Sequence, residues 1–149
     1  MTDFDYMQEA LALAKEAAEM DEVPVGALIV RRGEIIARAK NERELSRLAT
    51  HHAEIVAIEE ACRALGGWRL PESTLYVTLE PCPMCAGAII HARIERVVFG
   101  AHDEKNGAFG GAFDLSQMPN FFRPVIEGGV CEEECRQILS AYFRQKRKK

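Results

Sequence analysis

Two cysteines, Cys82 and Cys85, lie three positions apart in the segment LEPCPMCAG, a spacing found both in redox sites and in zinc sites. Earlier in the chain, His52 offers a neutral nitrogen ligand, and Glu54 offers a carboxylate two residues later. One histidine and two cysteines are one ligand fewer than a structural tetrahedral zinc site uses, so water would take the fourth position, as in catalytic zinc sites. These residues therefore favour a catalytic zinc centre over a redox pair.

Glu54 is the candidate for moving protons at this centre. Zinc can lower the pKa of bound water toward ~7, and a carboxylate that is not itself a ligand can take and relay the proton. Residues two apart in the middle of a helix point in nearly opposite directions, so His52 and Glu54 can share a site only where a helix begins. We therefore expect a helix to begin at or near His52.

The other histidines leave alternatives open. His51 stands beside His52, but the register with Glu54 favours His52 as the ligand. A structural zinc site with His91 or His102 as its fourth ligand would explain the cysteines without catalysis, although it leaves Glu54 without a role. The remaining thiols are expected to be buried or incidental, the last two of them on a separate helix: Cys62, Cys131 and Cys135.

Length and composition favour a single domain over residues 1–149. The 149 residues are 48% hydrophobic, which is enough for one core, whereas a second domain would be crowded. The chain has 19 basic and 23 acidic residues and a net charge of −4, but acidic residues gather near its start and basic residues close it. A basic end on an acidic body can still bind phosphates.

The sequence carries no signal for export or membrane insertion. Its first residues include acids where a signal peptide has its positive region, and no stretch approaches the ~20 apolar residues of a membrane span. Five cysteines are an odd number, and their spacing is not typical of a disulfide scaffold. We therefore expect reduced thiols, a cytoplasmic location and no association with a membrane.

Periodicity and turn residues predict a mixture of helices and strands. Thr2 and Asp5 form a weak capping box for a helix that ends near Asp21, and Gly33 marks the turn of a hairpin. The further elements predicted are strands over 25–30 and 34–39, a helix from His52 to Leu65, a strand over 73–80, a helix over 83–94, a strand over 96–101, a glycine-rich loop over 106–113, a short strand over 124–129 and a helix over 131–149. Strand, helix and strand over 73–101 form a βαβ unit with parallel strands. The expected fold class is α/β, a three-layer α/β/α sandwich with a mixed sheet of about five strands.

The residues that indicate zinc also match a family signature. The segments HAE, residues 52–54, and PCPMC, residues 81–85, fit the H-x-E and P-C-x-x-C pattern of the zinc-dependent nucleobase deaminases. Beyond this signature, the segments EVPVGALIV, TLYVTLEPCPMCAGAIIHARIERVVFGA and AYFRQKRKK resemble the bacterial tRNA-specific adenosine deaminases of the cytidine/deoxycytidylate deaminase superfamily. The resemblance covers nearly the whole chain and implies a cytidine deaminase-like fold.

This resemblance implies hydrolytic deamination of adenosine to inosine at the wobble position of a tRNA anticodon loop. It implies one Zn²⁺ per subunit, zinc-bound hydroxide as the nucleophile and Glu54 as the proton shuttle. By the same resemblance, Asn41 holds the base, Asp103 lies near the target ribose, and the tRNA anticodon stem-loop is contacted by Lys105, Phe143 and Arg144. The family works as a cytoplasmic homodimer. Phe121 and Phe122 replace an Asn-His pair common in the family and are expected in the core or in an interface.

Two rival functions share parts of this pattern. A free nucleobase or nucleoside deaminase, of guanine or cytosine type, would keep the zinc motif but would have no use for the basic C-terminal helix. A non-catalytic RNA-binding or scaffold subunit would keep zinc only for folding, and replacement of Glu54 would then be silent. Removal of the helix and replacement of Glu54 therefore separate the three readings.

Overall fold

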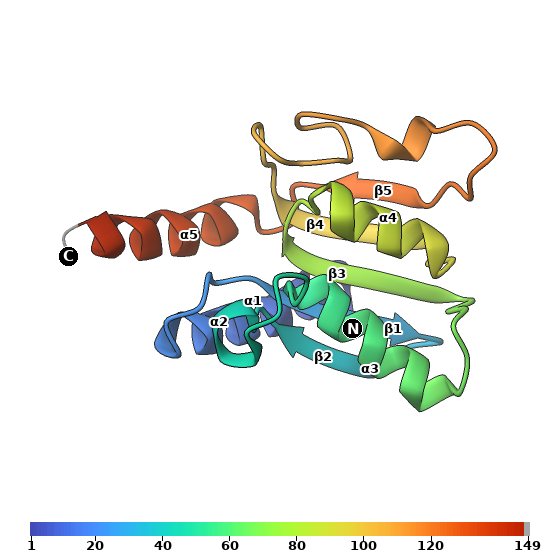
Figure 1. Ribbon diagram of the computed structural model, residues 1–149, viewed down its shortest axis with the longest axis horizontal. Helices are drawn as coiled ribbons and strands as arrows, with labels where there is room; N and C mark the ends of the chain where they lie inside the picture. The colour runs from blue at the N-terminus through green and yellow to red at the C-terminus, as the bar shows by residue number, and fades with distance from the viewer. Residues whose placement is uncertain (148–149) are drawn as a thin grey trace.

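A mixed sheet forms the centre of residues 1–147, the part of the chain that the structure, a computed structural model, describes. Its strands are β1 (Gly26–Arg31), β2 (Glu34–Lys40), β3 (Ser73–Leu79), β4 (Arg96–Ala101) and β5 (Val125–Gly128). They lie in the order β2-β1-β3-β4-β5 (Figure 1). β1 pairs antiparallel with both β2 and β3, whereas β3, β4 and β5 run parallel.

Helices cover both faces of this sheet. α1 (Asp3–Glu19) and α5 (Glu132–Arg147) pack on one face, and α3 (Ala53–Leu65) and α4 (Pro83–His91) pack on the other. Figure 1 shows α3 and α4 in front of the sheet and α1 behind it. The short helix α2 (Arg43–Ser46) and a 3₁₀ helix (Leu115–Gln117) lie in connections. The three-layer α/β/α sandwich with a mixed five-stranded sheet is therefore confirmed.

Local signals account for several element boundaries. Thr2 and Asp5 form the capping box expected at the start of α1, which ends at Glu19. Arg32 and Gly33 form the two-residue loop of the β1–β2 hairpin and both have positive φ angles, of 51° and 79°. That backbone matches the twist of the flanking strands, which is why glycine is favoured in such a turn.

Two predictions about helices need correction, and one short helix was not predicted. The helix predicted over 83–94 ends at His91, because Arg93 adopts a left-handed conformation with φ of 63° before β4. The closing helix begins at Glu132, because Cys131 is left-handed with φ of 55°; only Cys135 of this cysteine pair lies on the helix. The helix α2 had no clear periodic signal. Residues 148–149 of the predicted closing helix lie outside the described residues.

The fold brings the starts of α3 and α4 together. β3 and β4 are parallel neighbours, and the chain passes from the end of β3 directly into α4. α3 packs against α4 on the same face of the sheet. The two chemical motifs of the sequence therefore meet at the carboxyl end of β3. Among the described helices, none is long and apolar enough to cross a membrane.

Candidate metal centre and active site

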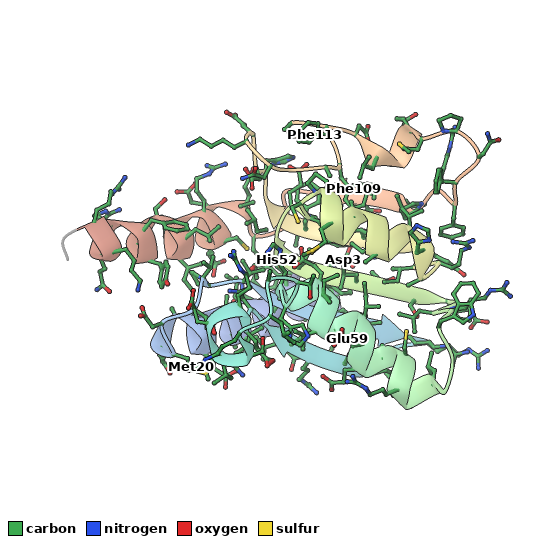
Figure 2. The ribbon with its side chains drawn as sticks, viewed as in Figure 1. Asp3, Met20, His52, Glu59, Phe109 and Phe113 are labelled. Atoms are coloured by element: carbon green, nitrogen blue, oxygen red, sulfur yellow. The ribbon has the colours of Figure 1, made fainter. Side chains whose placement is uncertain are left out.

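His52 lies at the point where α3 begins. It is the N-cap residue, with an extended backbone (φ −68°, ψ 158°), and the helix follows from Ala53. Because the backbone is not helical at His52, its side chain and that of Glu54 can reach the same site. In Figure 2, His52 lies at the centre of the molecule, between the starts of α3 and α4.

The two cysteines occupy a matching position at the start of α4. Cys82 is the N-cap residue, Pro83 begins the helix, and Cys85 lies in the first turn. Proline suits the first helical position because the missing N–H would have no partner inside the helix. The unpaired amides and the dipole of a helix N-terminus favour thiolates, so this position suits both sulfur ligands.

The ligand atoms are close enough to share one ion. Nδ1 of His52 lies 3.7 Å from Sγ of Cys82 and 3.6 Å from Sγ of Cys85. A tetrahedral zinc ion with bonds of about 2.3 Å to sulfur and about 2.0 Å to nitrogen would separate these atoms by roughly 3.5 Å. All three ligand atoms lie within 4.8 Å of one another. The donor set and its spacing therefore fit zinc, with one coordination position left for water.

Contacts among the three side chains of this cluster shift their pKa values. The hydrogen bond with Cys85 lowers the pKa of Cys82 to about 4, against the effect of burial, and a hydrogen bond with His52 adds to the lowering. Contact with Cys82, together with burial, raises the pKa of Cys85. The pKa of His52 is raised, chiefly by its hydrogen bond with Cys82. Because metals bind thiolates and neutral imidazole, binding of the ion would release the protons held here.

Glu54 is a buried carboxyl beside the cluster. It lies in the first turn of α3, and 4% of its surface is exposed. Burial raises the pKa of Glu54 to about 7, although its own backbone N–H and His52 act in the opposite direction. A carboxyl with a pKa in this range can both take and return a proton near neutral pH.

His52, Glu54 and Cys82 line a pocket of about 330 Å³. The pocket also contains two of the residues expected to contact substrate, Asn41 and Asp103. Two polar residues that the sequence did not single out, Arg43 and Asn106, line it as well. Its apolar wall includes Val23, Val25, Ala53, Leu79 and Pro83. A small pocket with a mainly apolar wall and a few convergent polar groups is typical of a ligand site.

A second buried carboxylate, Glu80, shapes the loop at the mouth of the pocket. It accepts hydrogen bonds from the backbone N–H groups of Asp103, Phe109 and Gly111 at 3.0, 3.0 and 2.8 Å. A Cβ atom on Gly111 would lie 2.6 Å from Oε1 of Glu80, which real contacts do not allow. The glycines of this loop therefore let its backbone close around Glu80, and Glu80 in turn places Asp103.

Comparison with known proteins assigns this geometry to a family. Residues 1–147 match the family of MafB19-like deaminases. The tRNA-specific adenosine deaminase of Bacillus subtilis is 55% identical over 145 residues, which are 97% of this chain and 90% of that protein. The chain belongs to the family of the tRNA-specific adenosine deaminases. The resemblance drawn from the HAE and PCPMC segments is thereby confirmed.

Two solved structures are similar to this chain in fold and in sequence. One comes from studies of A-to-I editing by tRNA:A34 deaminases at the wobble position of transfer RNA; it is 45% identical, has a TM-score of 0.85, and covers 91% of this chain and 99% of that chain. The guanine deaminase of Bacillus subtilis is 32% identical, with a TM-score of 0.67 over 99% of this chain and 95% of that chain. The fold of this deaminase family is therefore confirmed, and the tRNA-editing structure is the more similar of the two.

The expected RNA contacts lie outside the pocket in this family member. Lys105 is exposed on the loop after β4, where its backbone N–H donates to Oδ1 of Asp103 at 3.0 Å. Phe143 and Arg144 lie on α5 and line a separate hollow of about 440 Å³ that also contains His102, Arg136 and Arg147. The structure thus groups the three candidate zinc ligands with Glu54, Asn41 and Asp103, and leaves Lys105, Phe143 and Arg144 on the surface.

The alternative histidines do not join the cluster. Nε2 of His51 lies 3.4 Å from Oε1 of Glu59, and its Nδ1 is buried without a partner among the described residues. His91 lies edge-on to the ring of Phe121, with centroids 6.2 Å apart, and His102 lies 2.6 Å from Glu132. The geometry therefore favours three protein ligands including His52 over a closed site with four.

Proposed function

We propose that this chain deaminates adenosine to inosine at the wobble position of a tRNA anticodon loop. The observation that carries this proposal is the buried carboxyl of Glu54 in a pocket that it shares with His52 and Cys82. Support also comes from the 55% identity to a tRNA-specific adenosine deaminase and from the TM-score of 0.85 to a wobble-editing deaminase.

His52, Cys82 and Cys85 would hold one zinc ion. When bound, the ion supplies an acidified water as the nucleophile. Glu54 accepts one proton of the attacking water and delivers it to the ring nitrogen next to the reacting carbon C6. It then takes the remaining proton from the new hydroxyl on C6 and passes it to the amine, so that the C–N bond breaks, ammonia leaves and a carbonyl forms at C6. Its pKa of about 7 suits both directions of transfer, and its burial keeps bulk water away from the exchanging proton.

Asn41 and Asp103 would hold the nucleoside. Both line the pocket, Asn41 from the end of β2 and Asp103 from the loop after β4. A pocket of about 330 Å³ has room for a single base with part of its sugar, so the target must leave the base stack. Anticodon loops suit this demand because their bases are unpaired and can be turned outward at low cost.

Lys105, Phe143 and Arg144 would contact the stem-loop around the pocket. The hollow beside α5 combines three arginines with the exposed ring of Phe143, which are groups suited to phosphates and to base stacking. Arg144→Ala should weaken binding of the stem-loop and reduce the dependence of affinity on salt by about one unit of slope. Titration of the stem-loop at several salt concentrations measures this slope.

The same proposal includes a single deaminase domain over residues 1–149 that acts as a homodimer in the cytoplasm. Light scattering after gel filtration measures the mass of the assembly. A mass of one subunit at micromolar concentration would contradict the homodimer without affecting the proposed chemistry.

The deciding experiment compares an adenosine-containing anticodon stem-loop with free adenosine, cytidine and guanine. Zinc content is measured first, by atomic absorption, for the wild type and for Cys85→Ala. Inosine formed in the stem-loop alone, by wild type that contains one zinc per chain, is the expected result. Turnover of a free base with an unreacted stem-loop would overturn the proposal and favour nucleobase salvage, of the kind that the guanine deaminase likeness represents.

A further inference from the structure

A third buried carboxylate, Glu22, contacts the pocket residue Asn41 and has no part in the chemistry proposed above. Only 2% of its surface is exposed. Its oxygens accept hydrogen bonds from Nδ2 of Asn41 at 3.2 Å and from the backbone N–H groups of Glu44 and Leu45 at 3.1 and 2.7 Å. Glu22 therefore joins a pocket residue to the short helix α2.

The backbone on both sides of this contact is held in place. Asp21 has a left-handed conformation with φ of 60°, which ends the run of α1 and turns the chain inward. The backbone N–H of Glu22 then donates to the carbonyl of Ala17 at 2.9 Å, and the backbone N–H of Asn41 donates to Val25 at 3.1 Å. The backbone of neither residue can therefore move far without breaking a main-chain hydrogen bond.

Glu22 determines which way the amide of Asn41 faces. An ionised carboxylate can only accept hydrogen bonds, so the group that faces it must be the NH₂ of the amide and not the carbonyl oxygen. One hydrogen of Nδ2 is thereby engaged by Oε1 of Glu22. The second hydrogen and Oδ1 are then presented in a fixed arrangement to a base in the pocket.

We propose that Glu22 is a positioning residue that locks the amide of Asn41 in the orientation needed to hold the target adenine. This inference rests on the proposed function, because it assumes that Asn41 contacts the base. Adenine offers an N–H donor and a ring-nitrogen acceptor side by side, an arrangement that an Asn amide can match only one way round. If the amide of Asn41 turned by 180°, its donor would face the donor of adenine and its acceptor would face the acceptor of adenine.

Glu22→Gln tests this role with little change in shape. The NH₂ group of glutamine cannot accept a hydrogen bond. Either the amide of Asn41 then loses its acceptor and is free to turn, or a backbone N–H group of α2 loses its acceptor. We expect kcat/KM on the stem-loop to fall by about 10- to 100-fold, the loss of one hydrogen bond to a charged group. Zinc content should stay at the wild-type value. Glu19→Gln, on the exposed side of α1, removes the same charge nearby and should leave kcat/KM unchanged.

A double-mutant cycle separates positioning from support of α2. If Glu22 acts through the amide, then Glu22→Gln in an Asn41→Ala background should change kcat/KM by less than about twofold. If Glu22 only supports α2, its loss should reduce kcat/KM by the same factor in both backgrounds, which would overturn the inference. Wild type and Glu22→Ala, which has neither oxygen, are assayed alongside: an inactive wild type contradicts the proposed function, whereas an active wild type with equally active Glu22→Gln and Glu22→Ala contradicts this inference alone.

A second measurement needs no substitution at Glu22. In NMR spectra of the wild type, the side-chain amide of Asn41, assigned by its loss in Asn41→Ala, should show slow hydrogen exchange and restricted rotation. Fast exchange of both amide hydrogens at the rate of a free side chain would overturn the inference even if Glu22→Gln failed to fold.

Discussion

Glu54 and Glu80 are buried carboxylates on the walls of the same pocket, yet their surroundings differ. Glu80 is 2% exposed, and backbone N–H groups of Asp103, Phe109 and Gly111 donate to its oxygens. Glu54 is 4% exposed, and burial raises its pKa to about 7 because its own backbone N–H does not offset the lost hydration. Glu80 is therefore surrounded by hydrogen-bond donors, whereas Glu54 has few.

This difference separates a structural role from a chemical one. A buried carboxylate surrounded by N–H groups keeps its charge and organises the backbone that donates to it. A buried carboxyl with few donors binds its proton more readily and can exchange it with a substrate. We therefore expect substitutions at Glu54 to change the rate and substitutions at Glu80 to change the stability.

The largest effect should follow from Glu54→Gln. The amide keeps the shape of the side chain but cannot take a proton, so kcat/KM should fall by about 10²- to 10⁴-fold. The melting temperature should not fall, because the substitution removes a carboxyl whose ionised form is disfavoured by burial. Stem-loop turnover, zinc content and thermal unfolding of the same samples check this. A variant that keeps wild-type turnover would remove Glu54 from the chemistry and favour the scaffold reading.

Glu80→Gln should give the opposite pattern. One of the two oxygens becomes an NH₂ group, so at least one buried N–H of the loop after β4 is left facing a donor. The expected cost is about 1.5–3 kcal/mol of the free energy of unfolding, measured by urea denaturation. Activity should fall only as far as the loop carrying Asp103 is displaced. An unchanged free energy of unfolding together with a loss of activity would contradict the expected difference between Glu80 and Glu54.

Gly111→Ala tests whether the backbone of the same loop must pack closely around Glu80. Its Cβ would meet the carbonyl of Asp103 and lie 2.6 Å from Oε1 of Glu80, so the loop must shift at a cost of about 1–3 kcal/mol. Gly67→Ala is the matched control, because a Cβ there meets no atom within 4 Å. Urea denaturation of both variants should show a loss only for Gly111→Ala. Equal effects would mean that the loop does not close tightly around Glu80.

The cluster of His52, Cys82 and Cys85, which could hold a metal ion, could be anticipated from the sequence because residue type and spacing are local properties. His52, Cys82 and Cys85 each fall at the start of a helix, where a proline or a change of periodicity is visible in the chain. The hairpin and the capping box of α1 were visible for the same reason. The central sheet followed from runs of β-branched residues and from the short connections between them.

The supporting residues could not be anticipated, because their partners are distant in sequence. Glu22 and Glu80 look like ordinary surface acids until folding places backbone N–H groups around them. Arg43 reaches the pocket from α2, a helix too short to show a period. Cys131 and Arg93 end or delay helices through left-handed conformations that their residue types do not favour.

Asp3 extends the comparison to a carboxylate whose partner is a full positive charge. The guanidinium of Arg96 donates to both of its oxygens, at 3.0 and 2.6 Å, and the hydroxyl of Tyr76 donates at 2.6 Å. The hydrogen bond with Arg96 holds the pKa of Asp3 below its ordinary value of 3.8, although burial acts against it. This is the reverse of Glu54, whose pKa burial raises.

The smallest effect should therefore come from Asp3→Asn, and it should depend on pH. Because the pKa of Asp3 is lower in the folded state than in the unfolded chain, its contribution to stability is present above about 3.8 and is lost as the pH falls through the folded pKa. Solvent screening of this partly exposed pair limits the effect to less than about 1 kcal/mol. Urea denaturation at neutral pH should show Asp3→Asn less stable than wild type, and this difference in the free energy of unfolding should shrink toward pH 3, which lies below the pKa of Asp3 in the unfolded chain.

Glu16→Gln, on the exposed side of α1, is the control and should show no difference that shrinks with pH. A difference that stayed constant with pH would mean that Asp3 acts through the neutral hydrogen bond with Tyr76 and not through the charge of Arg96.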